Sequence, residues 1–333
     1  VWPSGKTRPT LSSRPAMRVI FAGTPDFAVP SLRAIAQSRH SVALVVTQPD
    51  RPAGRGRAPA APPIKRTAED LGLPVLQTGD INDPGVVRSL REAQADAVCV
   101  VAFGQKLRRT VLTLCQWGCM NAHASLLPLL RGAAPIVWSI LLGHTRTGVT
   151  TQKVAARFDE GDILLQRETD IGADETAGEL HDRLSVMAAE LWLPTLDGVE
   201  SGSITPKPQD HSLATFAPTL AKGQGQVNWS QPAAAIHNFV RAMTPWPSAQ
   251  TLATLASGQT LRLTILAVRP MEGAPAGEPG RVLAASAAGL VVAAGAGAVS
   301  VLRLQRAGKR PLDAAEFLRG CPIAAGDLFH APA

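Results

Sequence analysis

Two polar side chains at the end of an apolar segment are the first residues here that could do chemistry. Asn121 and His123 stand two positions apart in the stretch M-N-A-H-A-S-L-L-P. Alternate residues of a β-strand point to the same face, so a strand over residues 120–124 would present both side chains together. An amide and an imidazole on one face can stabilise an oxyanion and move a proton.

A carboxylate that could serve this histidine comes later in the chain. Asp159 precedes Gly161 in F-D-E-G-D, which we predict to be a turn between strands over 147–155 and 163–171. If the sheet brings this turn beside His123, Asp159 would orient the imidazole and raise its pKa toward neutrality. Asp and Gly also favour turns for conformational reasons alone, so the spacing leaves a structural role open.

The chemistry that suits these three residues is acyl transfer to an amine. The Asn121 amide can donate to a developing oxyanion, and His123 can carry a proton from the attacking amine to the leaving nitrogen. Ser125 lies near His123, but no G-x-S-x-G segment surrounds it, and the chain contains no tyrosine that could act as an acid. We therefore predict direct transfer without a covalent acyl-enzyme.

The elements that would position these residues alternate between strand and helix. Apolar runs and helical periodicity predict strands over 18–23, 41–47, 74–77, 96–102 and 120–124, and helices over 28–37, 64–72, 84–94, 107–115, 133–143 and 175–200. This alternation predicts an α/β fold with a doubly wound, mostly parallel sheet, which binds ligands beyond the carboxyl ends of its strands. G-T-P-D at 23–26 is not G-x-G-x-x-G, so we predict no NAD.

The C-terminal part has a different pattern. Beyond one helix over 232–243, short apolar runs separated by glycine predict a smaller β-barrel of the OB type. The predicted domains are a disordered N-terminal extension at 1–16, the α/β domain at 17–203, a Pro/Ser/Thr-rich linker at 204–222 and the barrel at 223–333.

Composition and charge narrow the class of protein. The hydrophobic content is 45%, and no apolar run is long enough to span a bilayer. Four cysteines without a C-x-x-C pair predict reduced thiols and no structural metal. Residues 17–204 carry 19 basic and 20 acidic residues, whereas residues 205–333 carry 11 basic and 6 acidic residues. The basic C-terminal part is the candidate for a polyanionic partner, although a solvated basic surface would have the same composition.

The stretch N-A-H-A-S-L-L-P-L-L-R-G-A-A-P-I closely resembles the signature of the folate-dependent formyltransferases. Further stretches that carry the resemblance are V-I-F-A-G-T-P-D-F-A-V-P, V-T-Q-P-D-R-P-A-G-R-G-R, V-V-A-F-G-Q-K-L and R-A-M-T-P-W-P. The resemblance runs from Met17 almost to the end of the chain. It implies the formyltransferase fold and 10-formyltetrahydrofolate as co-substrate. The P-D-R-P-A-G-R-G and P-W-P stretches are more specific and imply methionyl-initiator tRNA as the acceptor.

By resemblance, Asn121, His123 and Asp159 take the family's catalytic places. The segment associated with tetrahydrofolate corresponds to Ser125, Leu126, Leu127 and Pro128, and Phe103 and Gly104 are weaker matches to the pterin pocket. A proline that stiffens a turn and leucines that flank a flat pterin suit this role. The alternative is that the two leucines simply fill the core.

The resemblance also assigns tRNA contacts. Arg51, Arg55 and Arg57 lie in a Pro/Gly/Arg-rich stretch that predicts a loop over 48–63. They match the family's tRNA-contacting insertion, in which arginines can grip phosphate or a base edge. In the C-terminal part, the basic residues Arg303, Arg306, Lys309, Arg310 and Arg319 would attract phosphates nonspecifically, with A-G-K-R-P matching a family segment. Trp229 and Trp246 are predicted to be core or domain-interface residues, and Asn228 departs from the family's frequent Asp.

Other functions are compatible with the same three residues. One alternative is a formyltransferase for a small amine, such as glycinamide ribonucleotide or an amino sugar nucleotide, and another is a formyl-folate hydrolase. A third alternative, from a different class, is an RNA-binding module without activity. We expect a monomeric cytoplasmic protein of bacterial type that does not bind membranes, with an organellar location as the alternative.

Overall fold

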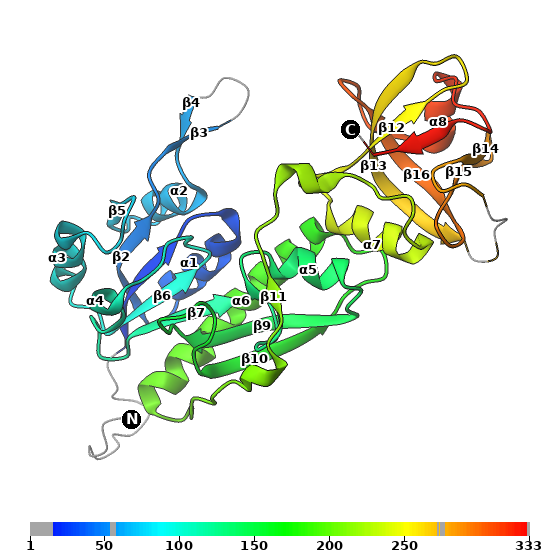
Figure 1. The fold of residues 1–333 in the computed structure, drawn as a ribbon. Helices are drawn as coiled ribbons and strands as arrows, with labels where there is room; N and C mark the ends of the chain where they lie inside the picture. Colours follow the sequence, from blue (N-terminus) through cyan, green and yellow to red (C-terminus); the bar gives the residue numbers. More distant parts are fainter. Residues whose placement is uncertain (1–15, 54–57, 272, 274–276, 332–333) are drawn as a thin grey trace. The chain divides into compact units, whose positions relative to one another are not determined.

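The computed structural model describes residues 16–53, 58–271, 273 and 277–331 (Figure 1). Two compact units make up the fold. The first consists of the chain up to Pro128 together with Val149–Arg167 and Leu184–Leu213, and the second consists of Leu129–Gly148, Glu168–Arg183 and Ala214–Ala333.

A seven-stranded sheet forms the centre of the N-terminal fold. Its spatial order is β10 (Ile163–Asp170), β9 (Arg146–Lys153), β7 (Cys119–His123), β6 (Ala97–Val101), β1 (Arg18–Gly23), β2 (Ser41–Thr47) and β5 (Val75–Gln77). The pairs among β5, β2, β1, β6 and β7 are parallel, and β7 pairs with β9 in the antiparallel direction. The predicted doubly wound, mostly parallel sheet is confirmed.

The chain order of these strands creates a crossover beside β1. From β1 the chain adds β2 and β5 on one side, and then returns to place β6 and β7 on the other side. Ligands bind in such sheets where the strand order reverses, outside the carboxyl ends of the strands. Residues that follow β1 and β6 meet there, because the Phe103 carbonyl accepts hydrogen bonds from Thr24 Oγ1 at 3.3 Å and Gln48 Nε2 at 2.9 Å.

Hydrophobic burial explains why these residues form the sheet. Five of the six residues of β1 and all five of β6 are buried, as expected for parallel strands that helices cover on both faces. The helices associated with this fold are η1 (Asp26–Ala28), α1 (Val29–Ala36), α2 (Pro63–Asp70), α3 (Pro84–Glu92), α4 (Arg109–Leu112), α5 (Pro135–Leu141) and α6 (Ala177–Ser201). Proline lies within the first two residues of α1, α2, α3 and α5, where its missing N–H costs nothing.

The arginine-rich stretch between β2 and α2 differs from its prediction. We predicted a loop over 48–63, but the structure contains a two-stranded antiparallel hairpin of β3 (Arg51–Ala53) and β4 (Ala58–Ala60). Pro52 and Pro59 face each other in the register of this hairpin. The high Pro and Gly content concealed this hairpin.

The C-terminal unit contains a second seven-stranded sheet. Its order is β14 (Val282–Ser286), β15 (Gly289–Ala293), β16 (Ala298–Arg306), β13 (Thr260–Met271), β12 (Ala249–Thr254) and β18 (Leu328–His330), with β17 (Leu312–Asp313) paired to β16. The sheet curls, and an isolated antiparallel bridge joins Arg281, next to β14, to Leu328 in β18. The two ends of the sheet therefore meet, which agrees with the predicted barrel-like architecture.

Shorter elements complete this part of the chain. They are η2 (His211–Leu213), η3 (Lys222–Gly225), α7 (Ala233–Ala242), α8 (Ala314–Arg319) and a two-stranded parallel sheet of β8 (Arg131–Gly132) and β11 (Phe216–Ala217). The prediction of a single helix in the C-terminal part is wrong, because α8 follows β17. Its six residues are too few to show a helical period in the sequence.

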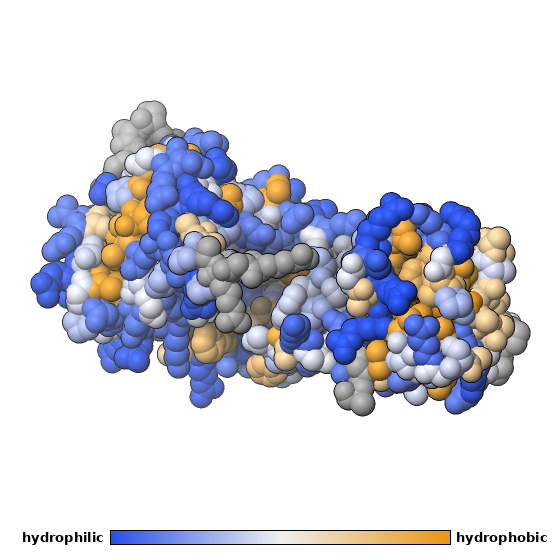
Figure 2. All heavy atoms as spheres, turned by 90° about the horizontal axis from the view of Figure 1, so that it is seen from above, coloured by the Kyte–Doolittle hydropathy of each residue, from blue (hydrophilic) through white to orange (hydrophobic). Residues whose placement is uncertain are grey.

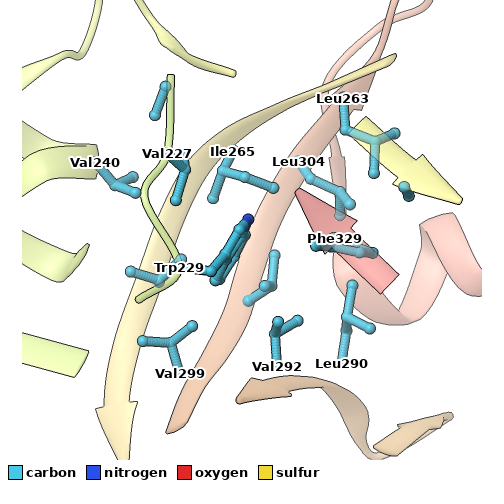
Figure 3. Close-up of a cluster of buried hydrophobic side chains, with 14 of the residues drawn as sticks. Val227, Trp229, Val240, Leu263, Ile265, Leu290, Val292, Val299, Leu304 and Phe329 are labelled. Carbon is cyan, nitrogen blue, oxygen red and sulfur yellow. The ribbon is translucent and has the colours of Figure 1, made fainter. Parts of the chain in front are cut away.

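The core of the C-terminal unit surrounds Trp229 (Figure 3). The Trp229 side chain is 4% exposed, packs edge-to-face on Phe329 with ring centroids 5.6 Å apart, and donates from Nε1 to Thr251 Oγ1 at 3.0 Å. Burial of an indole that keeps its hydrogen bond is favourable, and the predicted core position of Trp229 is confirmed. A core position for Trp246 is wrong, because that side chain is 55% exposed.

All four cysteines are buried free thiols, which leads to a prediction about their reactivity. Burial raises the pKa of Cys115 to about 11 and also raises the pKa values of Cys99, Cys119 and Cys321. Because the thiolate is the reactive form, we expect all four thiols of the native protein to react about 100-fold more slowly with a disulfide reagent near pH 8 than free cysteine does. A colorimetric thiol titration before and after denaturation checks this, and one fast native thiol would contradict it.

In the part of the chain that the structure describes, no helix is both long and apolar enough to cross a bilayer.

Candidate active site

Antiparallel pairing of β7 with β9 builds one polar face. Asn121 lies opposite Gln152, and His123 lies opposite Thr150. Directly opposed residues point to the same side of a sheet, and so do residues two apart in one strand. Asn121, Gln152, His123 and Thr150 therefore share one face, as the spacing of Asn121 and His123 predicted for that pair.

The segment between β9 and β10 returns over this face. The chain leaves β9 at Lys153, opposite Met120, yet Asp159 Oδ1 lies 3.7 Å from His123 Nδ1. Both side chains are largely withdrawn from solvent, with His123 7% and Asp159 15% exposed. A carboxylate at this distance limits the orientation of the imidazole ring.

Asp159 is held in an unusual backbone conformation. Its φ is 55°, in the left-handed region that non-glycine residues seldom adopt. Gln152 Nε2 donates to Asp159 Oδ1 at 2.9 Å, so the strand that faces Asn121 also fixes the carboxylate. Strained residues of this kind persist where surrounding contacts over-determine them, and they concentrate at functional sites.

A second glutamine fixes the backbone of the same turn. Gln209 is 6% exposed, and its Nε2 donates to the carbonyls of Asp159 at 2.8 Å and Gly161 at 2.7 Å. The same nitrogen lies 3.3 Å from Gln152 Oε1. These contacts tie the backbone of the turn to Gln209, and a buried polar group that lost its hydrogen bond would carry the cost of its desolvation.

The turn also depends on the absence of a side chain at Gly161. A Cβ atom there would lie 1.7 Å from the carbonyl oxygen of Lys153 and 2.7 Å from its carbonyl carbon. The main chain therefore passes closer to Gly161 than any side chain permits. Sequence analysis attributed this glycine to turn preference, whereas the close approach to Lys153 is the stronger reason.

The segment that follows His123 is fixed by a threonine of β9. Thr150 Oγ1 donates to the Ser125 carbonyl at 2.7 Å and accepts from Leu127 N at 3.1 Å. Gln166 Nε2 donates to Thr150 Oγ1 at 2.9 Å and to the Leu127 carbonyl at 2.8 Å. These contacts hold the segment rigidly beside the polar face, whatever it binds.

The folate candidates differ in their accessibility. Ser125 and Leu127 are buried, at 1% and 3% exposure, and Leu126 and Pro128 are half-buried. The alternative that the leucines fill the core therefore suits Leu127 better than Leu126. Phe103 is also buried, and its side chain packs in the core of the first unit.

The loop around Gly104 presents main chain rather than a side chain. Gly104 is exposed and has a φ of +77°, a conformation that favours glycine. The preceding Phe103 carbonyl receives the two hydrogen bonds from the segments after β1 and β2. This loop lies at the carboxyl end of β6, where open α/β sheets bind ligands.

The basic residues that we predicted to contact tRNA are exposed where the structure describes them. Arg51 lies in β3, while Arg55 and Arg57 lie outside the described residues. In the C-terminal unit all five predicted residues are exposed, namely Arg303 and Arg306 of β16, Lys309 and Arg310 of the following turn, and Arg319 of α8.

One of these charges is partly neutralised. Arg310 forms an ion pair with Glu316 at 2.7 Å, so it contributes less to a positive field than its neighbours do. Figure 2 shows hydrophilic residues over much of the visible face of the C-terminal part, at the right, next to exposed apolar residues.

Four supporting residues escaped sequence analysis, namely Thr150, Gln152, Gln166 and Gln209. A threonine in a strand and single glutamines carry no motif, and Gln209 lies in a stretch that reads as a Pro-rich linker. Their positions depend on strand register and on a contact across 50 residues of sequence. Within the described residues, no group of three His, Cys, Asp or Glu side chains is placed to hold a metal ion.

Solved structures with the same fold include a sugar formyltransferase and a protein bound to tetrahydrofolic acid. A sugar 3N-formyl transferase, WlaRD, matches 90% of this chain over its own full length with a TM-score of 0.60 and 15% identity. HypX from Aquifex aeolicus, solved in complex with tetrahydrofolic acid, matches 91% of this chain with a TM-score of 0.57 and 18% identity, over 47% of its length. At these identities the likeness concerns the fold.

Family models and relatives with higher sequence identity show the family of the chain, and not only its fold. The formyl transferase model matches residues 17–196, and the formyl transferase C-terminal domain model matches residues 219–322. Methionyl-tRNA formyltransferase of Solibacter usitatus is 48% identical, over 91% of this chain and 96% of its own length. The enzyme of the same name from Pelobacter propionicus is 45% identical, over 96% and 97% of the two chains. At this identity and coverage, the chain belongs to the methionyl-tRNA formyltransferase family.

Proposed function

We propose that the protein transfers the formyl group of 10-formyltetrahydrofolate to the α-amino group of methionyl-initiator tRNA, for the initiation of translation. The observation that carries this proposal is the placement of Asp159 against His123, on the face that also holds Asn121. The relatives' name and coverage of the whole chain support the choice of acceptor.

In the proposed mechanism, the neutral α-amino nitrogen attacks the formyl carbon, and an electron pair of the carbonyl moves onto its oxygen. The Asn121 amide and the protonated His123 imidazole donate hydrogen bonds to this oxyanion, while Asp159 stabilises the imidazolium. Collapse of the tetrahedral intermediate breaks the bond to the folate N10. His123 gives a proton to that nitrogen and regains one from the attacking amine, so the proton count is conserved.

Folate is proposed to lie along two segments that end at the polar face. Ser125, Leu126, Leu127 and Pro128 would border the pterin on one side, and Phe103 and Gly104 on the other. Exposed main chain at Gly104 can supply hydrogen bonds to the polar edge of a pterin, while half-buried Leu126 can contact its flat face. Folate acts here as a co-substrate, and the proposal requires neither a metal nor NAD.

The tRNA is proposed to contact basic residues of both parts of the chain. Arg51, Arg55 and Arg57 would contact the acceptor end, and the exposed Arg303, Arg306, Lys309 and Arg310 would attract phosphates. Such contacts weaken as salt rises, because binding releases counterions from the nucleic acid. We further propose that the protein is a cytoplasmic monomer, for which size-exclusion chromatography with light scattering is the test of oligomeric state.

A direct assay tests the acceptor. The purified protein is incubated with 10-formyltetrahydrofolate and methionyl-initiator tRNA, and formyl-methionyl ester is measured by mass spectrometry. Parallel reactions contain glycinamide ribonucleotide, an amino sugar nucleotide or no acceptor. Product that forms only in the reaction with charged tRNA supports the proposal. Transfer to a small amine, or release of formate without an acceptor, would show that the proposed acceptor is wrong and would leave the proposed chemistry of the site unchanged.

Arg55→Ala is expected to raise the KM for methionyl-initiator tRNA by about 10-fold, because one charged hydrogen bond to the nucleic acid is lost. The KM for 10-formyltetrahydrofolate is expected to stay unchanged. Steady-state kinetics with each substrate varied in turn checks both values. Arg88→Ala, which removes an exposed charge from α3, is the matched control. A rise in the KM for folate with unchanged use of tRNA would contradict this role for Arg55.

A further inference from the structure

An exposed aromatic side chain of the first unit lies next to the candidate active site. Phe158 is 68% exposed and directly precedes Asp159 in the turn between β9 and β10. Lys106 Nζ lies 5.8 Å from the centroid of the Phe158 ring, in cation–π contact. An exposed phenyl ring at a rigid turn is a surface on which another flat ring can stack.

This contact joins the segment around Gly104, which the proposed function assigns to folate, to the turn that carries Asp159. Lys106 follows Gly104 by two residues, in the stretch between β6 and α4, and Phe158 belongs to the turn that holds Asp159 (Figure 1). Both residues belong to the same compact unit. The Phe158–Lys106 pair therefore lies at the outer rim of the site, where the two segments reach solvent.

The rim is basic on the Lys106 side. Lys106, Arg108 and Arg109 are exposed, and no acidic residue occurs between Gly104 and Leu112. Two acidic residues lie near this rim. Asp80 interacts electrostatically with Arg108, and Glu160 lies 3.8 Å from Arg157, which precedes Phe158. A flexible anion that extends outward from the site would thus meet a ring first and a run of cations next.

We propose that Phe158 and Lys106 bind the benzoylglutamate end of the folate, and that the run from Lys106 to Arg109 favours folates with a γ-linked polyglutamate tail. The benzoyl ring stacks on Phe158, and the first carboxylates of the tail pair with Lys106. Additional glutamates, each with one more negative charge, extend toward Arg108 and Arg109. This inference rests on the proposed function, because it names the form of co-substrate that the same site prefers.

Calorimetric binding of 5-formyltetrahydrofolate, in its monoglutamyl and pentaglutamyl forms, tests the inference without requiring formyl transfer. The wild-type protein is expected to bind the pentaglutamyl form more tightly. Lys106→Gln is expected to reduce this preference by about threefold, the size of one exposed charge pair, and Lys106→Arg is expected to restore it. Phe158→Ala is expected to weaken both forms by about fivefold and to leave the preference intact, because stacking does not depend on the tail.

Arg33→Gln removes an exposed charge from α1 of the same unit and serves as the control for net charge. The inference is overturned if the wild-type protein binds the two forms equally, if Arg33→Gln changes the preference as much as Lys106→Gln, or if Phe158→Ala binds as the wild type does. Each of these results leaves the proposed function standing, since folate still binds. If the wild-type protein binds neither form, the proposed function and this inference fail together.

Discussion

His123→Ala is expected to lower the rate of formyl transfer to methionyl-initiator tRNA by about 10³-fold, the usual worth of a positioned acid or base. The variant loses both the charged donor to the oxyanion and the carrier of the proton to N10. Folate binding is expected to persist, because the segment after His123 is held by Thr150 and Gln166, and the loop at Phe103 by Thr24 and Gln48, rather than by His123. Single-turnover transfer with saturating folate and tRNA measures the chemical step.

The matched control is His181→Ala, which removes a half-buried histidine of α6 that pairs with Asp182 at 3.0 Å. Its transfer rate and thermal midpoint are expected to equal those of the wild type. Circular dichroism and folate binding of His123→Ala establish that it is folded. A folded variant with nearly normal transfer would exclude His123 from the mechanism and leave Asn121 and Asp159 without a proton carrier.

Most of the architecture followed from local sequence. β1 and β6 are short apolar runs bounded by turn residues, and such runs are buried on both faces only in a sheet that helices cover. The features that sequence analysis missed have little local signal. β12 pairs its buried residues with β13, but its sequence A-Q-T-L-A-T has weak hydrophobicity, and α8 is only six residues long.

Only part of the candidate site could be predicted from the sequence. The spacing of Asn121 and His123 placed them on one face, because both lie in a single strand. The contact of His123 with Asp159 depends on three tertiary facts: antiparallel pairing of β7 with β9, a register that puts Gln152 opposite Asn121, and a turn that folds back over the face. Hydrophobic periodicity alone predicts none of these, because it shows which residues of one strand share a face but not which strands pair or where a turn folds.

Gly161→Ala is expected to lower the free energy of unfolding by about 3 kcal/mol, because its methyl group would overlap main-chain atoms. The overlap is with the carbonyl group of Lys153, which no change of side-chain rotamer can relieve. The turn must therefore move, and with it the backbone that carries Asp159 and the two carbonyls that accept from Gln209. A shift of this kind away from His123 is expected to reduce transfer by about 10²-fold, even at temperatures where the variant is folded.

Gly79→Ala separates this effect from a general cost of losing a glycine. A Cβ at Gly79 would have no neighbour within 4 Å, and the residue is exposed, so stability and transfer are expected to match the wild type. Denaturant unfolding and single-turnover kinetics of the two variants give both quantities. If Gly161→Ala were as stable and active as Gly79→Ala, the turn could not approach Lys153 as closely as described. The position of Asp159 beside His123, which depends on that approach, would then need another support.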